Sequence, residues 1–391
     1  MAQAEADRLR KFVDLNVLHV RSTIGMYGAE KVILNLMGAF KGLASSMQVS
    51  SSVALIEGAN DQSKNLASLL EKQGSDSESI VSKKRLDFIA IKKLHSIIKH
   101  NRINVIHTHD YKSLLFIILA TIFSNKIIIH HIHGTLGNTR AERIYAFIER
   151  ICMARVDQII TVSQKQKKIL MAYRYLKNKV IQVNNGTVLP AHSVLKNNQY
   201  LCAPKNLFTI IMVARLTPEK NHQLAIDVLN ELIRNKTRNQ IKLLLLGDGP
   251  NLEAIKNQVK EYSLQDSIQL IGFSNDVQSW LEKSDLLLIT STTEGMPMCL
   301  LEAMAIGLPT VSSPVGEIPH ILTESKSGLL ANKKILLAES IITLMEDKNL
   351  YQEFSRNART YSEKHLSVQG QAQVLAGIYQ RLNSKNGSIC T

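Results

Sequence analysis

The segment LLLITSTTEGMPMCLLEAMAIGLP, residues 286–309, carries the pattern that decides the fold. It starts with an apolar run as long as a buried strand, and Glu294 follows where that strand would end. Pro297 suits the first turn of a helix, because its fixed φ is helical and its missing N–H is not needed there. A strand, a short turn and a helix in this order are typical of a parallel α/β sheet.

The same alternation extends to both sides of this segment. Short apolar runs alternate with amphipathic stretches, and only helical patterns follow from residue 333 onward. The expected strands are 15–20, 53–56, 105–107, 127–131, 159–162, 207–213, 242–246, 268–270, 286–289 and 310–312. We therefore predict an α/β fold of two doubly wound, Rossmann-like parallel-sheet domains facing a cleft, with helices at the C-terminus.

The alternation lapses in a polar stretch that contains Gly186, Pro190 and Pro204, which indicates a domain boundary. We expect the following division: an N-terminal α/β domain at 12–190, a linker at 191–206, a second α/β domain at 207–366, and a C-terminal helix and tail at 367–391. Whether that last helix crosses back to the first domain stays open at this point.

The composition excludes several classes of protein. The chain has 391 residues, of which 45% are hydrophobic and 20% charged, so it is neither a disordered chain nor a collagen-like fibre nor a small disulfide scaffold. The four cysteines form no C-x-x-C pair, which argues against a zinc ribbon and fits a reducing compartment. The longest apolar run, 114–123, is too short to span a bilayer and is expected to form a buried helix. Because the chain starts with polar residues, we expect a cytoplasmic protein.

The net charge of +14 is distributed unevenly along the chain. Residues 1–190 hold 27 Lys and Arg against 14 Asp and Glu, whereas the remainder holds 20 against 19. A basic half of this kind favours an anionic partner, such as a lipid headgroup, a phosphorylated substrate or a nucleic acid.

Two pairs of charged residues in the second half suit a phosphorylated sugar ligand. Glu294 and Glu302 flank the expected helix N-terminus, whose free N–H groups favour a phosphate. Arg215 and Lys220 flank the turn after the strand at 207–213, and both cations suit diphosphate oxygens. Structural explanations remain open for both pairs, since acids stabilise helix starts and a lysine commonly lies in a solvated turn.

Glycines at two expected strand–helix turns, Gly28 and Gly247, would let the backbone approach a ligand. Neither belongs to a G-x-G-x-x-G fingerprint or to a Walker A loop. The sequence also lacks an Asp-x-Asp motif, which would anchor a divalent cation on a diphosphate, and the Gly-x-Ser-x-Gly elbow of α/β-hydrolases.

Two histidine clusters, HTHD at 107–110 and HHIHGT at 130–135, each end an expected strand. A metal site is one interpretation, because alternating histidines share one face of a strand. No further cluster supplies carboxylate ligands, so we expect no metal and instead a hydrogen bond to substrate, with His133 best placed. For His130 and His131, side chains satisfied within the protein remain the alternative.

Together these motifs resemble glycosyltransferase family 4, the retaining enzymes with the GT-B fold. The resemblance covers residues 15 to 380 and is most specific in the second domain. The segments that carry it are EGMPMCLLEAMAIGLPTVSSPVGEIPHIL at 294–322, VARLTPEKN at 213–221, LLLLGDGP at 243–250, YGAEKVILNL at 27–36, IGF at 271–273, HGT at 133–135, TVSQ at 161–164 and NNGT at 184–187.

This resemblance implies that the second domain binds a nucleotide-diphosphate sugar. The implied contacts are Arg215 and Lys220 with the diphosphate, Glu302 with the ribose, Glu294 with the sugar, the amides of Met298 and Cys299 nearby, Gly272 and Phe273 near the base, and Gly247 beside the donor.

In the first domain, the implied acceptor side, Gly28 would let its loop approach the diphosphate and His133 would line the reaction centre. The expected catalytic residues are His133, Glu294, Arg215 and Lys220. The sequence departs from the family at Tyr27, where the family often has a glycine, so that a bulky ring lies close to the site.

The implied activity is transfer of a hexose-type sugar, with retained configuration, to a glycan or lipid-linked acceptor. Neither a metal ion nor a cofactor is expected, since Arg215, Lys220 and the helix N-terminus would meet the charge on the leaving diphosphate. A sugar-nucleotide epimerase of the GT-B type and a non-catalytic module that binds an anionic ligand are the alternatives. Nucleic acid is not an expected partner, because aromatic residues make up only 5% and no recognition-helix motif is present.

The excess positive charge suggests which part of the chain would bind a membrane that contains the acceptor. Basic residues surround an expected amphipathic helix at 85–100, whose apolar residues are Leu86, Ile89, Leu94, Ile97 and Ile98. The basic patch consists of Lys83, Lys84, Arg85, Lys92, Lys93, Lys99 and Arg102. It predicts peripheral attachment to the anionic inner face of a membrane, and a solvated surface helix is the alternative.

Overall fold

The computed structural model describes residues 15–23, 25–47, 49–58, 64–134, 140–190, 207–234 and 241–387. The chain divides into two compact units, the first formed by Met1–Gly186 with Val368–Thr391 and the second by Thr187–Ser367. The helix after residue 367 therefore belongs to the first unit. The predicted linker, 191–206, lies outside the described residues.

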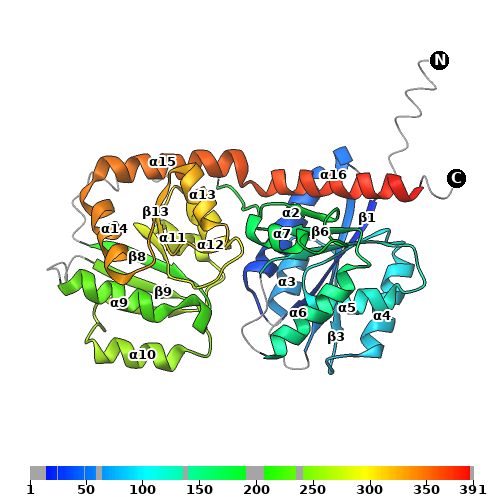
Figure 1. The fold of residues 1–391 in the computed structure, drawn as a ribbon, viewed down its shortest axis with the longest axis horizontal. Coiled ribbons are helices and arrows are strands. Elements are labelled where there is room, and N and C mark those ends of the chain that lie inside the picture. Colours follow the sequence, from blue (N-terminus) through cyan, green and yellow to red (C-terminus); the bar gives the residue numbers. More distant parts are fainter. Residues whose placement is uncertain are drawn as a thin grey trace, which may run out of the picture. The chain divides into compact units, whose positions relative to one another are not determined.

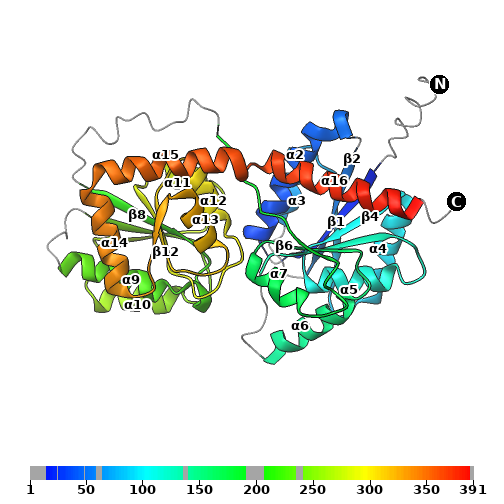
Figure 2. The same cartoon turned by 45° about the horizontal axis from the view of Figure 1, so that its top comes forward.

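The first unit is built on a seven-stranded parallel sheet with the strand order β3-β2-β1-β4-β5-β6-β7 (Figures 1 and 2). Its strands are β1 (Leu15–Thr23), β2 (Val49–Glu57), β3 (Ser77–Val81), β4 (Val105–Thr108), β5 (Ile127–Ile132), β6 (Gln158–Thr161) and β7 (Val180–Gln182). Its helices are α2 (Gly28–Met47), α3 (Lys64–Lys72), α4 (Phe88–His100), α5 (Tyr111–Ala120), α6 (Arg140–Met153), α7 (Gln164–Met171) and α16 (Val368–Gly387).

The two faces of this sheet are packed differently. Leu18 and Val20 of β1 join a core that includes Phe116 of α5, whereas His19 between them faces the opposite side, because side chains alternate along a strand. On that opposite side His19 contacts Phe40 of α2, with ring centroids 5.8 Å apart. Helix α16 runs beside α2 in both views, so the end of the chain helps to cover this face (Figures 1 and 2).

The second unit is built on a six-stranded parallel sheet with the strand order β10-β9-β8-β11-β12-β13. Its strands are β8 (Phe208–Val213), β9 (Ile241–Leu246), β10 (Ile268–Gly272), β11 (Leu286–Ile289), β12 (Thr310–Ser312) and β13 (Gly328–Leu330). Its helices are η2 (Pro218–Lys220), α9 (His222–Leu232), α10 (Leu252–Glu261), α11 (Val277–Glu282), α12 (Met298–Ala305), α13 (Ile318–Ser325), α14 (Lys334–Glu346) and α15 (Lys348–His365).

The predicted fold class, two parallel-sheet α/β domains with C-terminal helices, is confirmed. Three strands were missed: β3, β7 and β13. All three are short edge strands, and β3 exposes three of its five residues, so none shows the apolar run of a central strand. The expected buried helix at 114–123 is wrong at its end, because α5 stops at Ala120 and the side chain of Phe123 is 99% exposed.

Candidate active site

The centre of the predicted donor site in the second unit is an ion pair. Lys220 Nζ lies 2.7 Å from Glu294 Oε1, and Ser291 Oγ donates to the same carboxylate oxygen at 2.7 Å. Lys220 ends the turn after β8, whereas Ser291 and Glu294 follow β11. Because β8 and β11 pair in parallel, their carboxyl ends meet at one edge of the sheet and bring the two sequence signals together.

Hydrogen bonds between the two loops hold this pair in place. The backbone N–H of Thr292 donates to the carbonyl of Glu219 at 2.8 Å, and Thr290 Oγ1 donates to the carbonyl of Asn221 at 2.9 Å. Asn221 has a left-handed backbone with φ 53°, and its side chain accepts from the N–H of Leu224 to begin α9. Lys220 therefore projects from a rigid turn.

Arg215 lies in the same loop and contacts an acid that the sequence analysis did not single out. Its Nη2 is 3.3 Å from Glu219 Oε1, which also accepts from Thr217 Oγ1 at 2.7 Å. Partial burial favours the protonated acid. The hydrogen bond from Thr217 and the charges of Arg215 and Lys220 outweigh it and lower the pKa of Glu219. The Arg215 side chain remains 40% exposed, so it can reach a ligand.

Helix α12 begins beside Glu294, as predicted. The expected place of Pro297 in its first turn is wrong, because Pro297 is the N-cap residue with an extended backbone (φ −71°, ψ 132°). No side chain caps the first N–H groups of the helix. Met298 and Cys299 occupy its first turn, and Glu302, a half-buried residue, lies in its second. Burial, together with the charge of Glu294, raises the pKa of Cys299 to about 12, so the thiol stays protonated. Free N–H groups at this end can bind a phosphate oxygen.

Two glycines position these loops by close packing. A Cβ on Gly247, whose φ is +147°, would lie 1.9 Å from the carbonyl oxygen of Ala214. A Cβ on Gly316, with φ +60°, would lie 2.5 Å from the carbonyl oxygen of Glu294. Gly247 is therefore required by contact with the Arg215 loop, a reason the sequence analysis did not foresee, and Gly316 was missed altogether.

Gly272 and Phe273 lie at the end of β10. The backbone N–H of Gly247 donates to the carbonyl of Gly272 at 2.9 Å, so the two predicted donor-binding glycines are direct neighbours. Space is open around Gly272, and the Phe273 ring is 48% exposed, as a surface that receives a flat ligand requires.

In the first unit, Gly28 is the first residue of α2. The helix start is fixed by Glu30, which accepts from Arg21 Nε at 2.9 Å and from the N–H of Tyr27 at 3.2 Å. The Tyr27 ring lies over Gly25, where an added Cβ would approach it to 3.0 Å, and is 36% exposed.

His133 follows β5 and belongs to a stack of histidine rings. Its Nε2 is 2.9 Å from His109 Nδ1, and its ring stacks on His131 with centroids 4.2 Å apart. Burial lowers the pKa of His133 well below its ordinary value, and the neighbouring His131 and Arg21 lower it further, so the ring is neutral at pH 7.

The two histidines for which an internal role was left open behave differently. His130 is satisfied, with Nδ1 2.9 Å from Thr108 Oγ1 and Nε2 3.1 Å from Glu149 Oε1. The same expectation is wrong for His131, because neither of its ring nitrogens has a hydrogen-bond partner among the residues described. His19 of β1 and Tyr379 of α16 also reach this stack, although no motif marked them.

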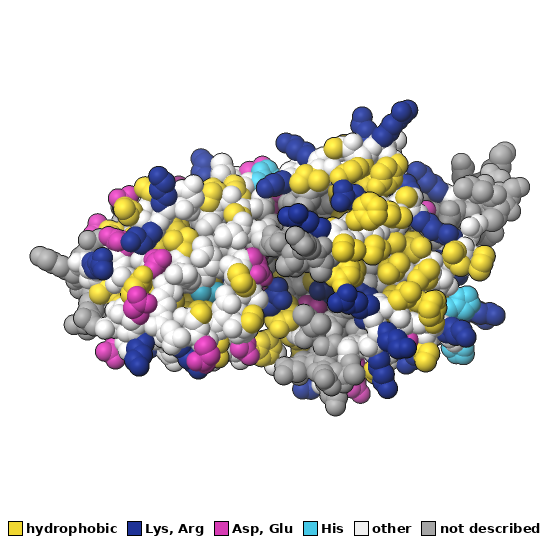
Figure 3. Space-filling view, turned by 60° about the horizontal axis from the view of Figure 1, so that its bottom comes forward, with side chains coloured by type: hydrophobic (Ala, Val, Ile, Leu, Met, Phe, Trp, Pro, Cys, Tyr) yellow, Lys and Arg dark blue, Asp and Glu magenta, His cyan; other side chains and the backbone are white. Residues whose placement is uncertain are grey.

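All residues of the basic patch are exposed on or beside α4. The apolar part of the prediction needs correction, because Leu94, Ile97 and Ile98 are buried against the sheet. The apolar side chains exposed beside the basic residues are Leu86, Phe88 and Ile89, and α6 adds Ile144, Phe147 and Ile151. Figure 3 shows apolar side chains gathered on the first unit with Lys and Arg around them.

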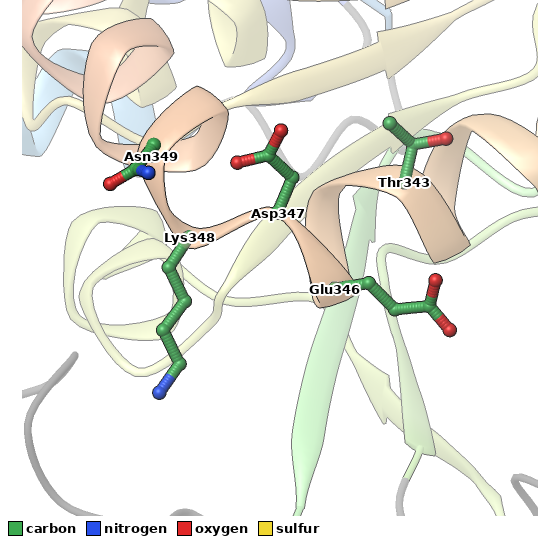
Figure 4. Close-up of a pocket in the computed structure, with 5 residues that line it drawn as sticks. All are labelled: Thr343, Glu346, Asp347, Lys348 and Asn349. Carbon is green, nitrogen blue, oxygen red and sulfur yellow. The ribbon is translucent and has the colours of Figure 1, made fainter.

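A pocket elsewhere in the second unit lies between α14 and α15 and is lined by Thr343, Glu346, Asp347, Lys348 and Asn349 (Figure 4). Glu346 and Lys348 diverge there, and Asp347 is used to cap α15 through the N–H of Leu350 at 2.9 Å. None of the predicted site residues lines it, so we assign no function to it.

Comparison with known proteins identifies the family. The family model for glycosyl transferases group 1 matches residues 196–361, and that for glycosyltransferase family 4 matches residues 58–189. The chain belongs to glycosyltransferase family 4.

Curated relatives of this family 4 glycosyltransferase act in glycan assembly. It is 24% identical over 278 residues to the UDP-Gal:alpha-D-GlcNAc-diphosphoundecaprenol alpha-1,3-galactosyltransferase of Escherichia coli. The aligned region covers 68% of this chain and 72% of that protein. It is 26% identical over 275 residues to the O-antigen biosynthesis glycosyltransferase WbnH of Escherichia coli, covering 69% and 76% respectively.

Among solved structures, HepE of Anabaena in complex with UDP-glucose superimposes with a TM-score of 0.78 at 19% identity, covering 94% of this chain and all of that chain. The two units therefore have the architecture of GT-B glycosyltransferases. Among the described residues, no helix is both long and apolar enough to cross a membrane.

Proposed function

We propose that this glycosyltransferase transfers a hexose-type sugar from a nucleotide-diphosphate donor to a glycan or lipid-linked acceptor, with retained configuration and without a metal ion. The observation that carries the proposal is the contact of Lys220 with Glu294 beside the free N-terminus of α12. A cation, a carboxylate and the N–H groups of Met298 and Cys299, which no side chain caps, could then all contact one diphosphate sugar.

The proposed donor contacts follow from this arrangement. Lys220 and Arg215 bind the diphosphate, Glu294 binds sugar hydroxyls, and Glu302, one turn into α12, binds the ribose. Phe273, exposed at the end of β10, lies against the base. The relative HepE, whose fold this chain shares, was crystallised with UDP-glucose, which makes a uridine donor the first to test.

The proposed chemistry needs little beyond charge stabilisation. The bond between the anomeric carbon and the diphosphate oxygen breaks, and the acceptor hydroxyl forms the new bond on the same face of the sugar. The acceptor proton passes to the leaving phosphate, whose charge is met by Arg215, Lys220 and the α12 N-terminus. Metal independence here means that no ion binds the donor diphosphate, and it is proposed because the sequence has no Asp-x-Asp anchor.

On the acceptor side, His133 of the first unit is proposed to contact the reacting sugar or acceptor through Nδ1, which has no hydrogen-bond partner among the residues described. The neutral ring can donate or accept a hydrogen bond there.

A lipid-linked acceptor is supported by the surface of the first unit. The basic patch lies beside exposed Leu86, Phe88 and Ile89, a combination that suits an anionic bilayer. The galactosyltransferase relative is named for a diphosphoundecaprenol-linked acceptor. We therefore propose that the protein works in the cytoplasm, attached peripherally to the inner face of the membrane.

Calorimetry and thermal melting with UDP, GDP, UDP-glucose, UDP-galactose and GDP-mannose test the donor. One base should raise the Tm of the wild type in proportion to the logarithm of ligand concentration, and Glu302→Ala should abolish this shift. The matched control is Glu253→Ala, an exposed acid of the same unit. If no nucleotide binds the folded wild type, the donor proposal is wrong.

Product analysis separates transfer from epimerisation. A transferase releases the nucleoside diphosphate once per sugar moved, whereas a simple epimerase releases none at steady state. Free UDP that appears only when a lipid-linked acceptor is added supports the proposed reaction. An interconverted sugar nucleotide without release would support the epimerase instead.

A further inference from the structure

A stack of histidines occupies the sheet face of the first unit that α2 and α16 help to cover. His19 lies on β1 opposite His107 of β4, and His109 and His131 continue the stack toward β5. All four side chains are at most 2% exposed. Polar rings in such a position need polar partners, because burial removes the water that would otherwise satisfy them.

Three of these rings are arranged as ligands. One ring nitrogen of each of His19, His107 and His109 lies within 4.8 Å of the others. His19 Nδ1 and His109 Nε2 are 3.0 Å apart, close to the separation of about 3.3 Å between two imidazole ligands on tetrahedral zinc. We propose that His19, His107 and His109 bind a transition-metal ion, Zn²⁺ in the first instance.

The second ring nitrogens of His107 and His109 support this assignment, whereas Nε2 of His19 has no hydrogen-bond partner among the described residues. His107 Nδ1 is 2.7 Å from the hydroxyl of Tyr379, which leaves Nε2 for the ion, and His109 Nδ1 is 2.9 Å from His133 Nε2. Metal-binding histidines typically hold their second nitrogen in this way, which fixes the ring and its tautomer. His107 Nε2 is buried and has no hydrogen-bond partner within the described part of the chain, as expected for an atom that awaits a ligand.

The ligand set selects the class of ion. Three imidazoles suit Zn²⁺, Co²⁺, Ni²⁺ or copper, whereas Mg²⁺ and Ca²⁺ require oxygen ligands. Three protein ligands leave a fourth position for water. None of the three ligands is one of the predicted donor-binding residues, and all three belong to the first unit.

The ion would also act on His133. With Nε2 of His109 bound to the metal, the proton of that ring resides on Nδ1 and donates to His133 Nε2. His133 then carries its own proton on Nδ1. This consequence rests on the proposed role of His133, but the metal site itself does not.

The test uses the full chain after removal of metal with a chelator. Zn²⁺ titrated into the protein should bind with a stoichiometry of one per chain and raise the Tm, and Co²⁺ should give the intense visible bands of a tetrahedral site. His107→Gln and His109→Gln should each weaken binding at least about 100-fold. His320→Gln, an exposed histidine of the second unit, is the control and should bind as the wild type does.

X-ray absorption on the metal-loaded wild type provides a measurement that does not depend on folding of the variants. A first shell of nitrogen and oxygen at about 2.0–2.1 Å, with imidazole scattering, supports the site. The inference is overturned if folded wild type binds no ion, or if His107→Gln and His109→Gln bind as tightly as His320→Gln does. The cluster would then be a chain of hydrogen-bonded neutral imidazoles only. Because every readout is binding, these results are independent of transferase activity.

Discussion

Lys220 Nζ contacts Glu294 Oε1 at 2.7 Å across 74 positions of sequence. Both side chains are largely buried, since Lys220 is 19% and Glu294 10% exposed. The pair is therefore fixed by the two loops that carry it, unlike an ion pair on the solvent-exposed surface. Each partner orients the other, and a donor that inserts here would find the two side chains already positioned.

We expect Lys220→Ala to lower kcat by about 100- to 1,000-fold, because it removes the charge that we propose stabilises the leaving diphosphate. Glu294→Gln keeps the shape but loses the ion pair, and it should also lower kcat. The check is steady-state release of nucleoside diphosphate with the donor that the binding panel identifies.

Lys256→Ala is the matched control for Lys220→Ala, since Lys256 pairs with Glu253 on the exposed surface of α10. It should retain wild-type rates. Equal activity of Lys220→Ala and Lys256→Ala would remove Lys220 from the catalytic residues.

Gly247→Ala should destabilise the second unit by more than about 3 kcal/mol, because its Cβ would lie 1.9 Å from a backbone oxygen that cannot move without the Arg215 loop. Gly377→Ala, in α16 with open space around the added Cβ, should instead be neutral or stabilise by about 0.5–1 kcal/mol. Chemical denaturation of both variants measures the difference. A Gly247→Ala protein as stable as the wild type would show that the turn can open.

The strands that sequence analysis recovered are those whose side chains are buried on both faces, such as β11, where all four residues are buried. The edge strands β3 and β13 were not predicted, because their residues are partly exposed and their sequences contain no long apolar run. Residue types and loop positions marked Lys220 and Glu294, but their contact depends on which strands pair, and spacing along the chain does not contain this information.

The histidine cluster shows the same limit. The alternation in HTHD and HHIHGT placed two histidines of each strand on one face. His19 and Tyr379 join them only because β1 lies next to β4 and α16 returns to the first unit. A basic helix can likewise be recognised from its composition, but which of its apolar residues face the sheet is decided by packing, and Leu94 is buried while Ile89 is 81% exposed.

The stability of the second unit should fall in mild acid because of His222. Burial lowers the pKa of His222 to about 4, and the charge of Lys220 contributes, whereas an unfolded histidine titrates near its ordinary value. The unfolded chain therefore binds the proton first as the pH falls. The stability contribution is complete above about pH 6.5 and is lost progressively toward pH 4, by up to about 3 kcal/mol.

Urea denaturation at pH 7 and at pH 4.5 measures this loss. His222→Asn should reduce the loss of unfolding free energy between the two pH values by about 2–3 kcal/mol, whereas His320→Asn, at an exposed position, should leave it unchanged. An identical pH dependence of His222→Asn and the wild type would contradict the assignment.

Attachment to anionic membranes should depend on both parts of the surface around α4. Replacing Lys83, Lys84 and Arg85 together by alanine should lower the partition coefficient on anionic vesicles about 100-fold or more at low salt, at about 1 kcal/mol per basic residue. Ile89→Glu should weaken binding at every salt concentration, because it removes an 81% exposed apolar side chain from the interface. Val374→Glu, at a 53% exposed position of α16 in the same unit, is the matched control.

Flotation with vesicles of neutral and of anionic lipid, at low and high salt, measures these effects. Electrostatic attraction is screened within about 8 Å at physiological ionic strength, so added salt should reduce vesicle binding by the wild type. The triple variant binds more weakly, and salt should change its binding much less. Because Leu94, Ile97 and Ile98 are buried, the apolar contact on or just before this helix is left to Leu86, Phe88 and Ile89. If the wild type does not float with anionic vesicles at low salt, the basic patch is a solvated surface and the acceptor reaches the enzyme from solution.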